Sequence, residues 1–238
     1  MKNNMAKWII LAVAAVVLIS AVIYLLAVNF GTTNVRQATE GDHDDIKVAA
    51  VGDSITYGLS VNNWSENAYP HQLADLLGEE YWVMNYGANN YAAMHSADFP
   101  YTDTQEYQDS LEFNPDIAVI MLGTNDSKDI NWQGTEQFRE EYTALIDSYI
   151  DNNPETEIYL ATPPKAFNDA SRPGDINNEN IDDIAAVIKD VSAGKNTELI
   201  DINQLSEENE QWFEMDGIHP DAEGAQNIAE AVYQHIAE

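Results

Sequence analysis

The sequence contains no cysteine, which excludes disulfide bonds, thiol nucleophiles and zinc–thiolate sites. It is also poor in positive charge, with 10 lysine and arginine residues against 41 aspartate and glutamate residues and a net charge of −31. A chain of this charge repels polyanions, so nucleic acid is not expected as a partner. The composition instead favours a small substrate that is neutral or only modestly charged.

Long apolar runs occur only near the N-terminus, where residues 8–28 form 21 residues without a charge. That length spans a bilayer as a helix, and Lys2 and Lys7 before it predict a cytoplasmic N-terminus with the rest of the chain outside. The alternative is a cleaved signal peptide and a secreted protein. The run is longer than a usual signal sequence, and residues 27–29 fit a cleavage site poorly. We therefore predict an uncleaved anchor in the cell membrane.

The rest of the chain has the composition of a short linker followed by one globular domain. The cluster GDHDD at residues 41–45 fixes no ligand geometry, so we interpret it as a solvated charge run and predict no metal site. The predicted segments are a cytoplasmic N-terminus at 1–7, a transmembrane anchor at 8–28, a polar tether at 29–45 and a catalytic domain at 46–238.

Short apolar runs alternate with longer amphipathic ones throughout the predicted domain. The strand candidates are 46–51, 81–85, 116–122, 157–161 and 198–202. The helix candidates are 68–77, 104–111, 135–150, 180–191 and 221–236. Such alternation is typical of a parallel sheet with helices on both faces. We predict a three-layer α/β/α sandwich with a central, mostly parallel five-stranded sheet of the flavodoxin-like type.

Polar motifs follow three of these strands, and the carboxyl ends of parallel strands meet at the edge where sites form. Ser54 follows the first strand in GDSIT, Gly87 the second in NYG, and Asn125 the third in GTND. Asp216 and His219 stand before the last helix in DGIHP, where a tight loop can turn the carboxylate toward one ring nitrogen. The other nitrogen can then face Ser54 and activate its hydroxyl for acyl transfer. Ser54 N–H, Gly87 N–H and the Asn125 amide are candidate donors to the oxyanion.

Each motif alone also fits an ordinary helix cap or turn, but together the four blocks resemble the SGNH hydrolase superfamily, or GDSL-type esterases. The resemblance covers about residues 46–236 and implies no cofactor. It implies a catalytic triad of Ser54, Asp216 and His219 and an oxyanion hole of Ser54, Gly87 and Asn125. The G-x-S-x-G elbow of α/β-hydrolases is absent, because Thr56 stands in place of its second glycine.

Two features bear on the substrate of such an esterase. Many relatives carry a second glycine three residues after the first in the second block, where this chain has Asn90, so the acyl pocket can differ in size. The stretches GDSITYG, AYPHQLADLLG and MLGTNDSKDINW are similar to the carbohydrate or acetyl esterase branch of the superfamily. Three aromatic residues near the same edge could stack on sugar rings or belong to the core or rim: Trp64, Tyr101 and Trp132.

The sequence thus predicts a membrane-anchored extracytoplasmic serine esterase that removes acetyl or other short acyl groups from an acylated glycan or another small neutral ester. Enzymatic alternatives are a lysophospholipase or thioesterase acting on longer acyl chains and an envelope O-acyltransferase. A non-enzymatic alternative is a catalytically silent surface binding module. The oligomeric state is left open.

Overall fold

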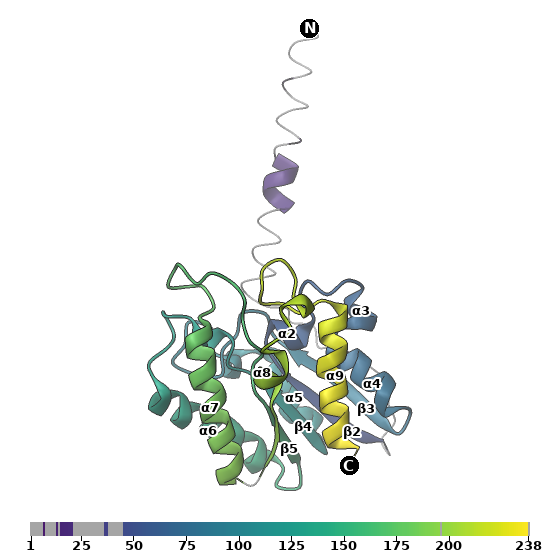
Figure 1. The fold of residues 1–238 in the computed structure, drawn as a ribbon. Helices are drawn as coiled ribbons and strands as arrows, with labels where there is room; N and C mark the ends of the chain where they lie inside the picture. Colours follow the sequence, from purple (N-terminus) through teal and green to yellow (C-terminus); the bar gives the residue numbers. More distant parts are fainter. Residues whose placement is uncertain are drawn as a thin grey trace.

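The computed structural model describes residues 7, 13, 15–20, 36–37, 45–195 and 197–237 (Figure 1). Its described residues form one six-stranded sheet in the order β1-β3-β2-β4-β5-β6. Five strands pair in parallel, which confirms the predicted parallel core of the sheet. They are β2 (Ile46–Gly52), β3 (Tyr81–Gly87), β4 (Ile117–Met121), β5 (Glu157–Ala161) and β6 (Glu198–Ile200).

The central strands are buried on both faces, which explains why their sequences are continuous apolar runs rather than alternating ones. All five residues of β4, IAVIM, are buried, and so are the last five residues of β2. In the parallel register Gly52 of β2 pairs with both Gly87 of β3 and Met121 of β4. The carboxyl ends of the three strands are therefore level, and the motifs that follow them begin at one edge.

Helices cover both faces of the sheet, as Figure 1 shows. One face packs against α5 (Gln105–Phe113), α6 (Thr135–Asn152) and α7 (Asn178–Lys195), whose buried side chains join the core of Ala49, Val51, Ala118 and Ile120. The other face packs against α4 (Tyr69–Leu77) and α9 (Ala222–Ile236), around Val48, Ala50, Val83 and Val119. Adjacent residues of β2 thus serve opposite cores, and the predicted three-layer sandwich is confirmed.

Several short elements in the connections were not predicted, because three to five residues are too few to display a helical period. They are the helices α2 (Ser54–Tyr57), α3 (Trp64–Asn67) and α8 (Ile202–Ser206) and the 3₁₀ turns at Tyr101–Asp103, Asn125–Ser127 and Glu210–Trp212. Two of them, α2 and the turn at Asn125–Ser127, lie directly after strands and carry predicted site residues.

Part of the predicted tether belongs to the sheet. The two-residue strand β1 (Arg36–Gln37) pairs antiparallel with Asn85 and Met84 of β3 and forms the edge of the sheet. The prediction of five strands is therefore one strand short. An edge strand of two residues needs only backbone hydrogen bonds, so its sequence carries no apolar alternation that could reveal it.

Most of the predicted anchor at residues 8–28 lies outside the described residues. Residues 13 and 15–20, which are described, are helical. Within the part of the chain that the structure describes, no helix combines the length and the apolar character needed to cross a bilayer. Residues 41–44 of the predicted charge run also lie outside the described residues.

Candidate active site

Ser54 stands at the junction between β2 and the short helix α2. At Gly52, the last residue of β2, a Cβ atom would lie 2.7 Å from the Met121 carbonyl oxygen, so glycine is required where the chain turns. Asp53 caps α2, because its Oδ1 atom accepts a hydrogen bond from Ile55 N–H at 2.9 Å. The turn leaves Ser54 at the carboxyl edge of the sheet with 6% of its surface exposed.

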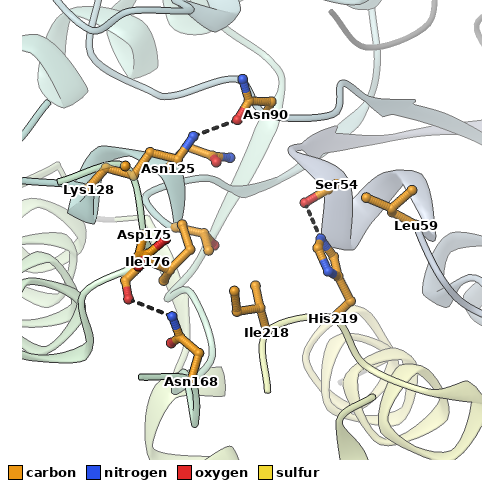
Figure 2. A pocket seen from close by; sticks show the side chains of 12 residues that line it. Ser54, Leu59, Asn90, Asn125, Lys128, Asn168, Asp175, Ile176, Ile218 and His219 are labelled. Carbon is orange, nitrogen blue, oxygen red and sulfur yellow. Dashed lines mark hydrogen bonds between the residues drawn. The ribbon is translucent and has the colours of Figure 1, made fainter. Parts of the chain in front are cut away.

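Ser54, His219 and Asp216 form one chain of hydrogen bonds, and its link between Ser54 and His219, 165 residues apart in sequence, is drawn in Figure 2. His219 Nε2 lies 2.9 Å from Ser54 Oγ, and His219 Nδ1 lies 2.7 Å from Asp216 Oδ2. The second carboxylate oxygen of Asp216 accepts hydrogen bonds from the backbone N–H groups of Ile218 and His219 at 2.9 and 3.0 Å. The structure therefore brings together all three residues predicted for the triad.

The loop of Asp216 is held in a conformation that only a glycine adopts easily. Gly217 has φ +66°, and a Cβ atom there would lie 2.7 Å from the Phe167 carbonyl carbon. Burial raises the pKa of Asp216, but hydrogen bonds from the His219 ring and from the backbone outweigh it and lower the pKa to about 2. Asp216 is thus ionised at every pH at which a histidine could act as a base.

Asn125 lies close to the serine, as predicted, in the 3₁₀ turn that follows β4. It lines the same pocket as Ser54 and His219. Its Nδ2 donates a hydrogen bond to the Tyr91 carbonyl at 3.0 Å, and its backbone carbonyl accepts one from Asn131 Nδ2 at 2.9 Å. The first bond fixes the side chain and leaves its second amide hydrogen for the pocket, and the second holds the backbone of the turn.

The Gly87 N–H group is not free to act as the oxyanion donor predicted for it. Its N–H donates to Asn85 Oδ1 at 2.9 Å and so is not available to a reaction intermediate. A Cβ atom at Gly87 would lie 2.2 Å from the backbone nitrogen of Tyr57, so the glycine serves to pack β3 against α2. By contrast, no described residue accepts a hydrogen bond from Ser54 N–H, which stays a candidate oxyanion donor.

The sequence interpretation missed the side-chain pair formed by Lys128 and Asn90, which lines the pocket (Figure 2). Lys128 Nζ donates to Asn90 Oδ1 at 2.5 Å, and Asn90 has φ +75°, a conformation that asparagine tolerates better than most residues. Lys128 is only 7% exposed. Burial lowers its pKa, although Asp98, Asp53 and Asp126 oppose this change. A lysine three residues after Asn125, in a chain this poor in basic residues, was the available signal.

Asp126 ties the loop after β3 to the loop after β4. The residue is fully buried, and its two carboxylate oxygens accept hydrogen bonds from Ala93 N–H at 2.9 Å and Met94 N–H at 2.8 Å. Burial raises the pKa of Asp126 to about 6, even though these bonds act in the opposite direction. The segment that carries Asn90 and Tyr91 is therefore clamped beside Asn125.

The pocket at this edge is small, with a volume of about 190 Å³. Its residues come from five loops: Ser54, Leu59, Asn90, Thr124, Asn125, Lys128, Asn168, Gly174, Asp175, Ile176, Ile218 and His219. Figure 2 shows Ser54 and His219 on one side of it and Asn125 and Lys128 on the other. Among the described residues, no group of three or more histidine and acidic side chains is arranged to hold a metal ion.

None of the three predicted sugar-stacking residues lines this pocket. Tyr101 is 0% exposed and donates a hydrogen bond to the Tyr86 carbonyl, so the stacking role predicted for it is wrong. Trp132 is half-buried and packs against the core beside Phe138. Trp64 is 43% exposed, and its ring contacts that of His71 edge-on.

Several known proteins resemble this chain in sequence. The sequence pattern of the GDSL-like Lipase/Acylhydrolase family matches residues 50–226. An acetylxylan esterase from Xylanibacter ruminicola is 33% identical over 207 residues, which cover 79% of this chain and 42% of that protein. A multidomain esterase from Ruminococcus flavefaciens is 27% identical over 80% of this chain and 28% of its own length. The chain thus spans less than half the length of these relatives.

Solved structures share the fold at low sequence identity. A carbohydrate acetylesterase from Sinorhizobium meliloti superposes with a TM-score of 0.65 at 17% identity, over 81% of this chain and 99% of that one. A lipase/acylhydrolase from Enterococcus faecalis superposes with a TM-score of 0.60 at 23% identity, over 80% and 94% of the two chains. The family pattern covers most of the domain and includes all the residues that meet at Ser54, so this chain belongs to the GDSL-like lipase/acylhydrolase, or SGNH hydrolase, family.

Proposed function

We propose that this protein is a serine esterase that removes acetyl or other short acyl groups from saccharides, and that Ser54, His219 and Asp216 are its catalytic triad. The proposal rests on two consecutive hydrogen bonds. His219 Nδ1 lies 2.7 Å from Asp216 Oδ2, and His219 Nε2 lies 2.9 Å from Ser54 Oγ. A nucleophile, a base within hydrogen-bond reach of it and a carboxylate that orients the base are the elements that acyl transfer requires.

In the first half of the reaction Ser54 Oγ attacks the acyl carbonyl carbon while His219 Nε2 takes the hydroxyl proton. Asp216 accepts a hydrogen bond from His219 Nδ1–H, which keeps Nε2 free to act as the base and stabilises the imidazolium that forms. The tetrahedral intermediate then collapses: the bond from carbon to the sugar oxygen breaks, and that oxygen takes the proton from His219. Water repeats the sequence on the acyl-serine and releases the carboxylic acid and the free enzyme.

The negative oxygen of each intermediate needs donors already in place. Ser54 N–H and the second amide hydrogen of Asn125 supply them. The buried ammonium of Lys128 lies in the same pocket, held by Asn90, and adds positive charge there. This set replaces the predicted one, in which Gly87 was the third donor.

A pocket of about 190 Å³ is smaller than the roughly 300–1,000 Å³ that pockets for drug-sized ligands enclose. It suits a short acyl group better than the long chain that a lysophospholipase or thioesterase would bind. The X. ruminicola and S. meliloti relatives, an acetylxylan esterase and a carbohydrate acetylesterase, support an acetylated saccharide as the substrate.

Hydrolysis of p-nitrophenyl esters from acetate to octanoate tests this function. We expect turnover to be highest for acetate, and Ser54→Ala to reduce it at least about 10³-fold without lowering the melting temperature, because the serine lies outside the core. Highest turnover with octanoate would favour the long-chain alternative. A wild-type protein without Ser54-dependent turnover would be a binding module, and acyl transfer to an added saccharide in place of hydrolysis would identify an acyltransferase.

We also propose that residues 8–28 anchor the protein and that the active site faces the outside of the cell. The support comes from the sequence alone: 21 uncharged residues preceded by Lys2 and Lys7. Intact cells should hydrolyse an impermeant ester, and an external protease should release the domain. A soluble form in the medium that begins near Asn29 would show instead that the segment is a cleaved signal. If the domain is protected from the protease until the cells are lysed, the active site faces the cytoplasm and the proposed orientation is wrong.

A further inference from the structure

A second hollow, with a volume of about 440 Å³, adjoins the catalytic pocket on the far side of the loop that carries Asp216. We call it the 167/213 groove, after Phe167 and Phe213, which line it. Asn168 lines both the groove and the catalytic pocket, and Asp216 lines the groove while its carboxylate holds His219. The groove and the catalytic pocket are therefore neighbours that share Asn168 and the loop of residues 216–219.

The groove has an apolar side built from three side chains. The rings of Phe167 and Phe213 pack against each other with their centroids 5.2 Å apart, and both residues are only half-buried. Met215 beside them is fully exposed, at 104% of its reference surface. Aromatic rings and a flexible methionine offer flat and adaptable apolar surface. Such surface matches the C–H faces of sugar rings.

The polar side of the groove consists of hydrogen-bond acceptors. Its four acidic lining residues are Asp169, Glu210, Glu214 and Asp216, and no lysine or arginine is among its lining residues. Asn168, which the groove shares with the catalytic pocket, is held by the hydrogen bond from its Nδ2 to the Ile176 carbonyl at 3.0 Å. Four carboxylates without a cation among the lining residues favour a ligand that donates hydrogen bonds and carries no negative charge. Hydroxyl groups of a neutral saccharide meet both conditions.

The groove and the catalytic loop are parts of one hydrogen-bonded unit. Phe167 N–H donates to the Gly217 carbonyl at 2.7 Å, and Glu214 N–H donates to the His219 carbonyl at 2.8 Å. The close contact between Gly217 and the Phe167 backbone leaves no room for a side chain between them. A ligand in the groove is thus held at a fixed position relative to His219.

We propose that the 167/213 groove is a subsite for the neutral sugar units that adjoin the acylated sugar, so that the substrate is an oligo- or polysaccharide rather than an acylated monosaccharide. This inference rests on the proposed esterase function. It adds that the sugar chain leaves the catalytic pocket past Asn168 and Asp216, and that polyuronates and other anionic glycans are excluded.

The kinetic test compares kcat/KM for an acetylated xylo-oligosaccharide with kcat/KM for an acetylated methyl xyloside. Phe213→Ala should lower the ratio of the two about three- to tenfold, the range expected for an aromatic contact. Met215→Ala should lower it in the same direction, and its exposed side chain makes no contribution to folding. Leu205→Ala is the matched control, because Leu205 is 39% exposed and does not line the groove. A ratio unchanged in both groove variants overturns the subsite.

A binding measurement makes the test independent of turnover. Ser54→Ala protein should bind a deacetylated xylo-oligosaccharide in a calorimetric titration, and adding Phe213→Ala should raise the Kd about three- to tenfold. Equal binding of a polygalacturonate fragment would overturn the claim of neutrality. Failure of the esterase function would instead remove Ser54-dependent hydrolysis of p-nitrophenyl acetate by the wild type, so the two failures can be told apart.

Discussion

Replacement of Asn125 by alanine tests the proposed oxyanion hole most directly. An amide nitrogen carries two hydrogens, and Asn125 commits one of them to the Tyr91 carbonyl at 3.0 Å. The other is available to the pocket. Removing a donor that acts mainly on the developing oxyanion lowers kcat by about 10²–10³, or ~2.7–4 kcal/mol of transition-state stabilisation. The substrate carbonyl carries far less charge than the intermediate, so KM should change little.

The same substitution also has a structural effect that must be separated from the catalytic one. Without Asn125 Nδ2 this hydrogen bond to the Tyr91 carbonyl is lost, which costs roughly 1 kcal/mol of folding stability. Asn180→Ala is a matched control, because Asn180 Nδ2 donates to the Ser127 carbonyl of the same loop at 2.8 Å but does not line the pocket. It should lower stability by a similar amount and leave kcat within about threefold of the wild type.

Steady-state kinetics with p-nitrophenyl acetate and urea denaturation measure the two effects on each variant. If Asn180→Ala lowers kcat as much as Asn125→Ala does, the loop as a whole matters and the amide has no special role. If Asn125→Ala raises KM and leaves kcat unchanged, the amide binds the ground state and the proposed oxyanion hole is wrong.

Three further predictions follow from the charged groups of the site. Asp216→Asn should lower kcat by about 10⁴-fold, since an amide cannot keep His219 Nδ1 protonated and Nε2 free, and a loss below tenfold would contradict the triad. Lys128→Met should lower kcat about tenfold, equal to ~1.4 kcal/mol, because it removes the positive charge from the pocket, whereas Lys128→Arg should retain more activity. The third concerns stability. Burial raises the pKa of Asp126 from 3.8 to about 6. At pH values between these two, the folded protein therefore binds more protons than the unfolded chain, and its stability falls as the pH rises from one value to the other. This group alone should lower the free energy of unfolding by ~2–3 kcal/mol between about pH 4 and pH 6. Urea denaturation at several pH values should show this decrease in the wild type but not in Asp126→Asn. If the free energy of unfolding depends on pH in the same way in both proteins, the prediction for Asp126 is refuted.

Much of the fold was predictable because it depends on patterns that the sequence displays. Strand β5 was predicted at its observed bounds, and the other parallel strands within two residues at either end, since continuous apolar runs between polar loops have few alternatives in a covered sheet. The meeting of Ser54 with Asp216 and His219 was also predictable. Parallel strands place their carboxyl ends at one edge, and the spacing of Asp216 and His219 suits a single loop.

The failures concern groups whose neighbours depend on loop conformation. Gly87 was the natural oxyanion donor by motif, but only the structure shows that Asn85 accepts its N–H. Tyr101 looked like a rim aromatic, yet the loop after β3 folds it into the core, where its hydroxyl bonds to the Tyr86 carbonyl. The pairing of Lys128 with Asn90 joins residues 38 positions apart on two irregular loops, and no period in the sequence relates them.

The distribution of charge over the catalytic pocket and the 167/213 groove favours one orientation of the proposed substrate. Lys128 is the only lysine or arginine among the described residues that line the catalytic pocket, whereas the 167/213 groove has carboxylates and no such cation. A carbonyl that becomes negative in the transition state is favoured beside the ammonium, and hydroxyl groups that donate hydrogen bonds are favoured beside the carboxylates. An acetylated saccharide has both features, on opposite sides of its ester bond. Bound in the reverse orientation, it would place its ester beside Asp169 and Glu214 and away from Ser54, where no attack could occur. In the proposed function, the same acidic residues that keep polyanions away would also orient a neutral substrate for attack by Ser54.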